Sequence, residues 1–498
     1  MQGDTGPRAG LNTVETTLDD IRQAFEAGEL SSVELVRTYL DRIQALDRGG
    51  PGINSIIAIN PKAIESAEAL DAARAASGPK GLLHGVPVIL KDQIDVAGMA
   101  TTLGSVLFKD YYPDRDAFVV EQLKRAGAVI LAKATLGEMG GGDTHGSLFG
   151  STRNPYDLER TVGGSSGGTA AAIAANLGAV GVGQEAFSSI RRPSAWTSIV
   201  GMRPTAGLVS RSGVYAGWPG VQASLGPMTR TVADAAALLD VLAGYDPEDP
   251  VTAMGVGTQR QPFVSYLDAG SLANARIGVL REPMGAGTEP DSDDFAQVSA
   301  VFDRAVVELR EAGTAIVDPV TIPQLKELLS KRASGPDAEP AWDVYFGRSA
   351  RAPFKSREEM LAAPDFELVL NKRMASIGAW NVEAHHEYLV ARAQLMFNLM
   401  KTMADLELDA IVHKSAEHQP TLIRDAFIPP FVGMRGATHM NTFLVYVPSI
   451  SVPIGFTAES LPVGMTFVGR PYSDGAMIAL AYSYEQATHH RKPPASTP

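Results

Sequence analysis

Short apolar segments bounded by glycine or proline alternate along the chain with segments of helical periodicity. Such apolar segments indicate buried strands. They lie at residues 86–90, 128–131, 277–280, 449–455 and 463–469. The helical patterns lie at residues 117–126, 232–243 and 476–487. Strands that alternate with helices predict an α/β fold.

Two helices are predicted at the start of the chain. Thr17 and Ser31 are each followed, three positions later, by an acidic residue, which is the pattern that caps a helix N-terminus. The second helix carries an apolar stripe at helical spacing, formed by Val33, Val36, Leu40 and Ile43. We therefore expect this helix to pack against the rest of the protein.

The middle of the chain contains both small-residue and irregular segments. Residues 163–183 consist almost entirely of Gly, Ser and Ala with scattered apolar residues, so we expect a tightly buried helix that begins at a glycine-rich loop. Residues 245–274 and 322–387 are richer in charge, proline and aromatic residues and lack clear periodicity. They are predicted to form loops and peripheral helices.

The composition is that of a globular protein. Of the 498 residues, 45% are hydrophobic and 20% charged, which excludes a disordered chain, and the absence of cysteine excludes disulfides, thiolate metal sites and a cysteine nucleophile. The net charge of −13 argues against a nucleic acid or an anionic membrane as partner. Residues 1–8 show no signal peptide and no run of 18 apolar residues occurs, so we predict a cytoplasmic protein.

The glycine-flanked serine pair in Gly164–Gly168 allows three interpretations. It lacks the Gly-Lys-Ser/Thr ending of a phosphate-binding loop. It fits the G-x-S-x-G pattern of a nucleophile elbow with Ser166 at the centre, but residues 158–162 make a poor strand and no histidine stands in a recognisable context. The third interpretation is a turn selected only for flexibility.

Two further segments carry candidate chemistry. Lys91 ends the apolar segment 86–90. A lysine there is usually a surface charge, but in a dry pocket it loses its proton easily and serves as a general base. The other segment, Gly183–Arg191, contains the adjacent serines Ser188 and Ser189. Each segment alone is a weak signal.

In this order, the three segments resemble the amidase signature family of serine hydrolases. Its members share a Gly-Gly-Ser-Ser-Gly-Gly run, a Gly-Ser-Ile-Arg loop whose working serine lies 24 positions after the first serine, and an upstream Gly-x-Pro-x-x-x-Lys-Asp strand. Here that spacing leads from Ser165 to Ser189. The resemblance extends from about Val14 to Pro494. Its flanking motifs are Thr152–Pro155, Gly201–Thr205, Ser224–Asp234, Pro448–Phe456, Leu461–Met465 and Gly469–Pro471.

The resemblance implies a role for each site residue. Ser189 would be the nucleophile, Ser165 the bridging serine whose peptide bond the family holds in cis, and Lys91 the base. Neutral Lys91 would withdraw a proton from Ser165, which relays one from Ser189, and the reversed relay would protonate the departing amine. The oxyanion would be bound by the backbone amides of Ala186, Phe187, Ser188 and Ser189. Supporting roles would fall to Ser166, Glu185 and Arg191.

The nucleophile loop departs from the family pattern. The family usually has Asp-Thr-Gly-Gly-Ser-Ile-Arg, whereas this chain has Glu-Ala-Phe-Ser-Ser-Ile-Arg at residues 185–191. If either glycine position needs a positive φ, Phe187 or Ser188 would be strained there, and the choice between Ser188 and Ser189 would stay open. The Ser-Ile-Arg frame and the spacing favour Ser189. Gln93 replaces the usual Asn, which should alter only packing or a hydrogen bond.

The resemblance implies the amidase signature fold, a large, mixed and twisted β-sheet flanked by helices on both sides. We expect a single domain over residues 1–498, with a signature core at about 80–230 and a variable substrate-pocket region at about 320–440. The aromatic residues of that region either line an acyl or aryl pocket or simply pack peripheral helices. They are Trp342, Tyr345, Phe346, Phe354, Phe366 and Trp380.

The family cleaves carbon–nitrogen bonds through an acyl-enzyme. We therefore expect an amidase for hydrophobic or aromatic amides and also carbamates, on the urethanase and aryl-acylamidase side of the family. Its partners would be substrate and water, with no cofactor, nucleic acid or membrane, and the chain would be a monomer or homodimer. A metal site is not expected, because the adjacent His385 and His386 cannot share a helix face. Two alternatives are a non-catalytic amidase-like binding protein, disabled at Phe187 and Ser188, and a glutamine-dependent amidotransferase subunit.

Overall fold

A large mixed β-sheet forms the centre of the molecule in the computed structural model, which describes residues 13–215, 223–336, 338–372, 380–427 and 433–498. The predicted absence of a signal peptide concerns residues outside these ranges. The sheet has 11 strands. In spatial order they are β1 (Ile56–Ile59), β3 (Val129–Ala134), β2 (Pro87–Lys91), β8 (Val180–Glu185), β10 (Ser224–Thr229), β9 (Val200–Arg203), β16 (Ser449–Phe456), β17 (Pro462–Val468), β14 (Ala410–Lys414), β11 (Arg276–Leu280) and β13 (Ala315–Val320). The predicted α/β class and the mixed sheet are confirmed.

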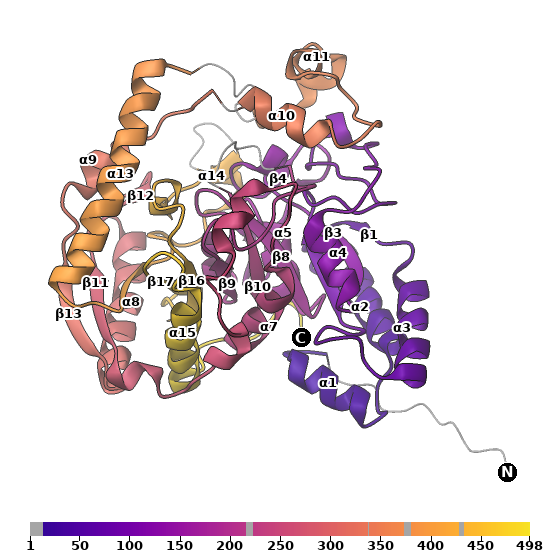
Figure 1. Cartoon of the computed structure of the whole chain (residues 1–498), viewed down its shortest axis with the longest axis horizontal. Helices are drawn as coiled ribbons and strands as arrows, with labels where there is room; N and C mark the ends of the chain where they lie inside the picture. The colour runs from indigo at the N-terminus through magenta and orange to yellow at the C-terminus, as the bar shows by residue number, and fades with distance from the viewer. Residues whose placement is uncertain (1–12, 216–222, 337, 373–379, 428–432) are drawn as a thin grey trace.

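Helices flank the sheet (Figure 1). The α-helices are α1 (Leu18–Glu26), α2 (Ser32–Arg42), α3 (Ala63–Ser77), α4 (Phe118–Arg125), α5 (Gly167–Ala174), α6 (Arg191–Trp196), α7 (Val232–Leu242), α8 (Asp293–Glu311), α9 (Leu325–Ser330), α10 (Ala338–Phe346), α11 (Arg357–Leu361), α13 (Val382–Asp405), α14 (Ile423–Phe427) and α15 (Asp474–Thr488). No described helix is long and apolar enough to cross a membrane.

Short elements complete the fold. Three two-stranded ribbons pair β4 (His145–Gly146) with β5 (Gly150–Ser151), β6 (Arg153–Asn154) with β7 (Asp157–Thr161), and β12 (Gly285–Ala286) with β15 (Ala437–Thr438). The single-turn and irregular helices are η1 (Ile43–Arg48), η2 (Val106–Phe108), η3 (Glu138–Gly140), η4 (Pro250–Gly255), η5 (Phe263–Tyr266), η6 (Ser271–Asn274), η7 (Pro364–Leu368) and η8 (Met440–Thr442). Residues 158–162, judged a poor strand, form most of β7, which pairs outside the main sheet.

The two N-terminal helices begin where the sequence predicts. Thr17 and Ser31 each form a complete capping box with the acidic residue three positions on. On α2 the stripe is shifted from the prediction: Val36 is buried, while Val33 and Leu40 are half-buried at its edge. Leu35 and Tyr39 are buried instead. The inward face of α2 is therefore wider than the predicted stripe and includes a tyrosine.

Strand β2 has a parallel neighbour on each side, which explains its uniform hydrophobicity. β2 pairs in parallel with both β3 and β8, so it lies between two parallel strands and is covered on both faces. Val88, Ile89 and Leu90 are completely buried. Because β2 and β8 run in the same direction, their carboxyl ends emerge side by side.

The small residues of α5 permit close packing against the sheet. A Cβ at Gly168 would lie 2.2 Å from the Thr135 hydroxyl, and one at Gly181 of β8 would lie 2.5 Å from the Thr169 methyl. Every residue of α5 is buried. The predicted buried helix after the glycine-rich loop is therefore confirmed, and steric exclusion explains its composition.

Candidate active site

The parallel strands β2 and β8 bring the predicted base and the predicted nucleophile loop together. Lys91 is the last residue of β2, and Glu185 is the last residue of β8. The loop 186–189 follows β8 directly and leads into α6. Ser165 lies in the glycine-rich turn before α5, the helix that packs on these strands. The site thus forms at the carboxyl edge of adjacent parallel strands, where loops from several strands converge.

Lys91, Ser165 and Ser189 form a continuous chain of contacts. Lys91 Nζ lies 2.7 Å from Ser165 Oγ, and Ser165 Oγ lies 3.0 Å from Ser189 Oγ. Lys91 also donates to the carbonyl of Gln184 at 3.3 Å. The peptide bond between Gly164 and Ser165 is cis, as the resemblance implied. The sequence prediction placed these three side chains together, and the structure does so.

Burial differs along this chain of contacts. Lys91 and Ser165 are completely buried, whereas Ser189 is half-buried. Burial holds the pKa of Lys91 well below its ordinary value, and the negative charge of Glu185 opposes this shift only in part. The arrangement therefore favours a neutral amine at the closed end and leaves a hydroxyl accessible at the other.

Glu185 and Arg191 hold the nucleophile loop at both of its ends. The two side chains form a buried ion pair, with Arg191 Nε 2.7 Å from Glu185 Oε1. Glu185 Oε2 also accepts from the backbone amides of Ile190 and Arg191, and Arg191 donates to the carbonyl of Phe187. Burial by itself raises the pKa of Glu185, but the charge of Arg191 and these amides outweigh burial and lower it. The supporting carboxylate is therefore ionised.

Ser166 links the glycine-rich turn to β8. Its hydroxyl donates to the carbonyl of Gln184 at 3.1 Å and accepts from the amide of the same residue at 3.2 Å. Its own amide donates to the carbonyl of Ser189 at 3.1 Å. Ser166 therefore holds the turn against the loop. The Lys91 amine donates to Ser165 and to the Gln184 carbonyl, while the Ser166 hydroxyl bonds the backbone of Gln184, which disfavours Ser166 as the nucleophile.

The loop 186–189 accommodates its two unusual residues without left-handed backbone. Neither Phe187 nor Ser188 is among the described residues with positive φ. Within the described part of the chain, the amides of Phe187, Ser188 and Ser189 donate to no protein acceptor. Such donors are what an oxyanion requires, so the substitutions leave the backbone able to supply them.

Phe187 lies in an aromatic stack that sequence reasoning did not predict. Its ring stacks on that of His439 with centroids 4.8 Å apart and planes 9° from parallel, and the guanidinium of Arg332 lies 4.6 Å from the centroid of Phe187. Burial lowers the pKa of His439 to about 4, so its ring is neutral at physiological pH. No sequence signal near His439 or Arg332 pointed to this contact, because the three residues come from distant segments.

A second buried network lies beside the strand that carries Lys91. Lys133 of β3 forms an ion pair with Asp92 at 2.9 Å and donates to the hydroxyl of Thr101. That hydroxyl donates to Asp95, which also accepts from the hydroxyl of Tyr345 at 2.7 Å. The residues after Lys91 are thereby connected to α10.

Glu138 makes a similar connection to the loop beside Ser165. Its buried carboxylate accepts from the amides of Leu370 and Asn371 at 2.8 and 2.7 Å. The amide of the preceding residue, Gly137, donates to the carbonyl of Ser165 at 3.0 Å. The resemblance places the glycine-rich segment 136–145 where the family has a loop over the site, but it assigned no role to Glu138 within it.

Most of the predicted aromatic residues pack against one another. Trp342, Tyr345 and Phe346 are buried together with Phe108, Tyr111 and Tyr215, and Phe354 and Phe366 are partly buried beside them. Trp380 does not join this cluster; it is 40% exposed and contacts His385. The structure therefore favours the packing interpretation over a pocket lining for the buried rings. Among the described residues, no cluster of three or more His, Asp or Glu side chains could hold a metal.

Comparisons with known proteins agree with this geometry. The family model Amidase matches residues 34–478. The A-subunit of glutamyl-tRNA(Gln) amidotransferase from Symbiobacterium thermophilum is 35% identical over 497 residues, covering 96% of this chain and 98% of the relative. The native peptide amidase of Stenotrophomonas maltophilia is 33% identical, with a TM-score of 0.85 over 98% of this chain and 100% of that one. A bacterial aryl acylamidase is 25% identical, with a TM-score of 0.76 over 95% and 96%.

The chain belongs to the Amidase family, the amidase signature enzymes whose motifs the sequence contains. The relatives and structures span almost the full length of this chain, and they include proteins named for three different reactions. These similarities establish the family. Because its members act in different reactions, family membership alone does not select a substrate.

Proposed function

We propose that the chain is an amidase that hydrolyses hydrophobic or aromatic amides, and also carbamates, through an acyl-enzyme on Ser189. The observation that carries this proposal is the contact chain from Lys91 through Ser165 to Ser189. Along this chain of contacts, a buried amine with a lowered pKa is followed by a bridging hydroxyl and then by an accessible hydroxyl. A serine hydroxyl becomes nucleophilic when a neighbouring base removes its proton.

In the proposed mechanism, neutral Lys91 takes a proton from Ser165 as Ser165 takes one from Ser189. The Ser189 oxygen then forms a bond to the carbonyl carbon, and the oxyanion accepts hydrogen bonds from the amides of the loop 186–189. Collapse of this intermediate breaks the carbon–nitrogen bond, and the relay returns its proton to the leaving amine. Water, deprotonated by the same relay, hydrolyses the ester and regenerates Ser189.

The preference for hydrophobic or aromatic substrates rests on the surroundings of this loop. The half-buried Ser189 lies two residues from Phe187, whose ring belongs to the stack with His439 and Arg332. The similarity to an aryl acylamidase is compatible with such a substrate. The single-domain organisation over residues 1–498 and the cytoplasmic location stay predictions.

A matched pair of substrates tests the proposal. Aniline release is measured from an aryl amide and from the corresponding aryl carbamate, with the wild type beside Ser189→Ala and Ser188→Ala. We expect both substrates to be cleaved, Ser189→Ala to be inactive and Ser188→Ala to retain activity. If glutamine or asparagine is hydrolysed while neither aryl substrate is, the proposed substrate class is wrong.

A glutamine-dependent amidotransferase subunit is the second candidate. It is favoured by full-length relatives of that name at 30–35% identity. Stable capture of companion subunits by the tagged protein would support it, and full activity of the isolated chain would exclude it. The third interpretation, a non-catalytic binding protein, predicts that a fluorophosphonate fails to label Ser189. The complete contact chain and the loop's available amides argue against this interpretation.

A further inference from the structure

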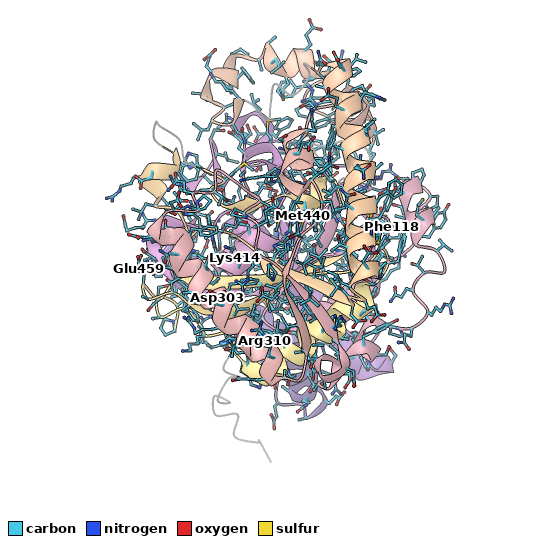
Figure 2. The ribbon with its side chains drawn as sticks, turned by 90° about the vertical axis from the view of Figure 1, so that its left-hand side faces the viewer. Phe118, Asp303, Arg310, Lys414, Met440 and Glu459 are labelled. Carbon is cyan, nitrogen blue, oxygen red and sulfur yellow. The ribbon has the colours of Figure 1, made fainter. Side chains whose placement is uncertain are left out.

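One face of the long helix α13 exposes apolar side chains along much of its length. Val382, Leu389, Val390 and Phe397 are 70%, 44%, 55% and 68% exposed. The opposite face is buried in the protein through residues such as Tyr388, Ala391, Leu395 and Leu399. In Figure 2, α13 runs over the face of the molecule that is turned toward the viewer.

The spacing of these residues places them in one stripe, which the exposed His386 interrupts between Val382 and Leu389. At 3.6 residues per turn, the four exposed side chains lie within an arc of about 100° on the helix surface. Ala393, which is also exposed, lies within the same arc near its middle. From Val382 to Phe397 the stripe extends over about 22 Å of the helix, at a rise of about 1.5 Å per residue. An exposed apolar stripe of this length marks an interaction surface more often than a solvated face.

The charges beside the stripe identify its partner. Glu383 lies near the start of α13 and Lys401 near its end, and the helical spacing places both on the same edge of the stripe. Ala393 lies close to the midpoint between them. In an antiparallel pair of identical helices related by a two-fold axis, the same edge of each helix lies on the same side of the pair. The two edges run in opposite chain directions, so the start of one lies beside the end of the other. Glu383 of each copy would then meet Lys401 of the other copy.

We propose that the protein forms a two-fold symmetric homodimer in which α13 packs antiparallel against α13 of a second copy. The crossing point is Ala393, whose small side chain allows the two backbones to approach. Leu389 of one copy then lies near Phe397 of the other, and the Glu383–Lys401 pairs close the interface at each end. Lys401 also contacts Asp405 within its own helix, so the intermolecular pair extends an existing ion pair.

Sedimentation of the full-length chain over a range of concentrations tests this interface. We expect a reversible dimer, and we expect Phe397→Glu to raise its dissociation constant by at least about 30-fold, because it buries a charge in the centre of the contact. The control is Val344→Glu on α10, because Val344 is 70% exposed, close to the 68% of Phe397, but lies off the stripe. Its dissociation constant should equal that of the wild type.

Charge exchange tests the antiparallel register. Glu383→Lys or Lys401→Glu alone should weaken the dimer several-fold, and the double variant should restore it, because each new lysine again meets a glutamate of the other copy. A wild type that stays monomeric at the highest concentration tested, or a dimer that Phe397→Glu leaves intact, would overturn the proposal. Additive weakening in the double variant would also overturn this arrangement.

Discussion

Two regions of the molecule are stabilised by different means. We call the first region the relay core; it comprises β2, the turn at Ser165, α5, β8 and the loop 186–189. It buries polar groups that hydrogen-bond specific partners. The aromatic segment, residues 338–369, instead buries a cluster of packed rings, as in the stack of Phe108 on Phe346 with centroids 5.7 Å apart. Buried polar groups are costly unless each finds its partner, whereas apolar packing tolerates exchange at similar volume. We therefore expect the relay core to tolerate few substitutions and the aromatic segment to tolerate apolar exchange at similar volume.

Polar contacts connect the surroundings of the relay core to the aromatic segment and to the residues just beyond it. Tyr345 donates to Asp95, four residues after Lys91, and Glu138 binds the backbone just beyond the aromatic segment. These contacts link the aromatic segment and the residues just beyond it to the neighbourhoods of Lys91 and Ser165. Substitutions in the core should therefore alter the chemical step, and substitutions in the segment should alter stability or substrate binding.

The largest effect is expected at Lys91. Lys91→Ala should lower kcat about 10²- to 10⁴-fold, because it removes the base. Lys91→Arg should not rescue activity, since a guanidinium stays protonated. In the wild type, kcat/KM should rise with pH as Lys91 loses its proton and then reach a plateau. His439→Gln should leave this acidic limb in place, because His439, with a pKa of about 4, is already neutral. If the rise of kcat/KM with pH disappears in His439→Gln, the titrating group would be His439 and not Lys91.

The next largest effect is expected at Glu185. Glu185→Gln leaves Arg191 as an uncompensated buried charge, so the free energy of unfolding should fall by about 3–5 kcal/mol in urea titrations. Because the charge of Glu185 raises the pKa of Lys91, its removal should also move the acidic limb of kcat/KM to lower pH.

The matched control is Asp143→Asn, which breaks the other buried arginine pair, with Arg192. We expect it to destabilise the protein without moving the limb. Equal shifts in both variants would mean that Glu185 does not act on Lys91 through its charge.

A third prediction concerns the aromatic segment alone. Trp342→Ala should cost about 3 kcal/mol locally and increase proteolysis within residues 338–369, because the ring is buried and contacts Phe346 at 4.3 Å between centroids. Substrate KM should rise while kcat changes little. A loss of kcat comparable to that of Lys91→Ala would show that the segment takes part in the chemical step.

The smallest effect is expected at Tyr345. Tyr345→Phe removes one hydrogen bond to Asp95 and should lower stability by about 1 kcal/mol in a urea titration. Burial raises the pKa of Asp95 to about 6, and the Tyr345 hydroxyl limits that rise, so the variant should shift the pKa of this carboxyl further upward. An Asp95 pKa that stays unchanged, followed by NMR of the carboxyl, would show that the two groups are not coupled.

The sequence was most informative where steric exclusion or buried polarity restricts the choice of residue. The strand at 86–90, the small-residue helix after Gly164 and the two capped helices were predictable because few residue types satisfy those positions. The contact between Lys91, Ser165 and Ser189 was predictable only through the family motif, since no local pattern brings three distant segments together.

The remaining features depend on tertiary contacts without a local signature. The stack of Phe187 on His439 joins residues 252 positions apart. The aromatic residues of the segment could be recognised as buried or as pocket-lining only once their neighbours Phe108 and Tyr111 were known. Likewise, α13 lacks a sharp periodic pattern because both of its faces carry apolar residues.

The central claim is that Ser189 forms the acyl-enzyme, and peptide mapping tests it directly. A slowly hydrolysed aryl carbamate is mixed with the wild type, the reaction is quenched in acid, and the digested protein is analysed by fragment-ion mass spectrometry. Because the amine leaves first, we expect the added alkoxycarbonyl mass on Ser189 and no such mass when Lys91→Ala is used. An alkoxycarbonyl mass located on Ser188, or turnover of the carbamate with no labelled serine, would contradict the assignment.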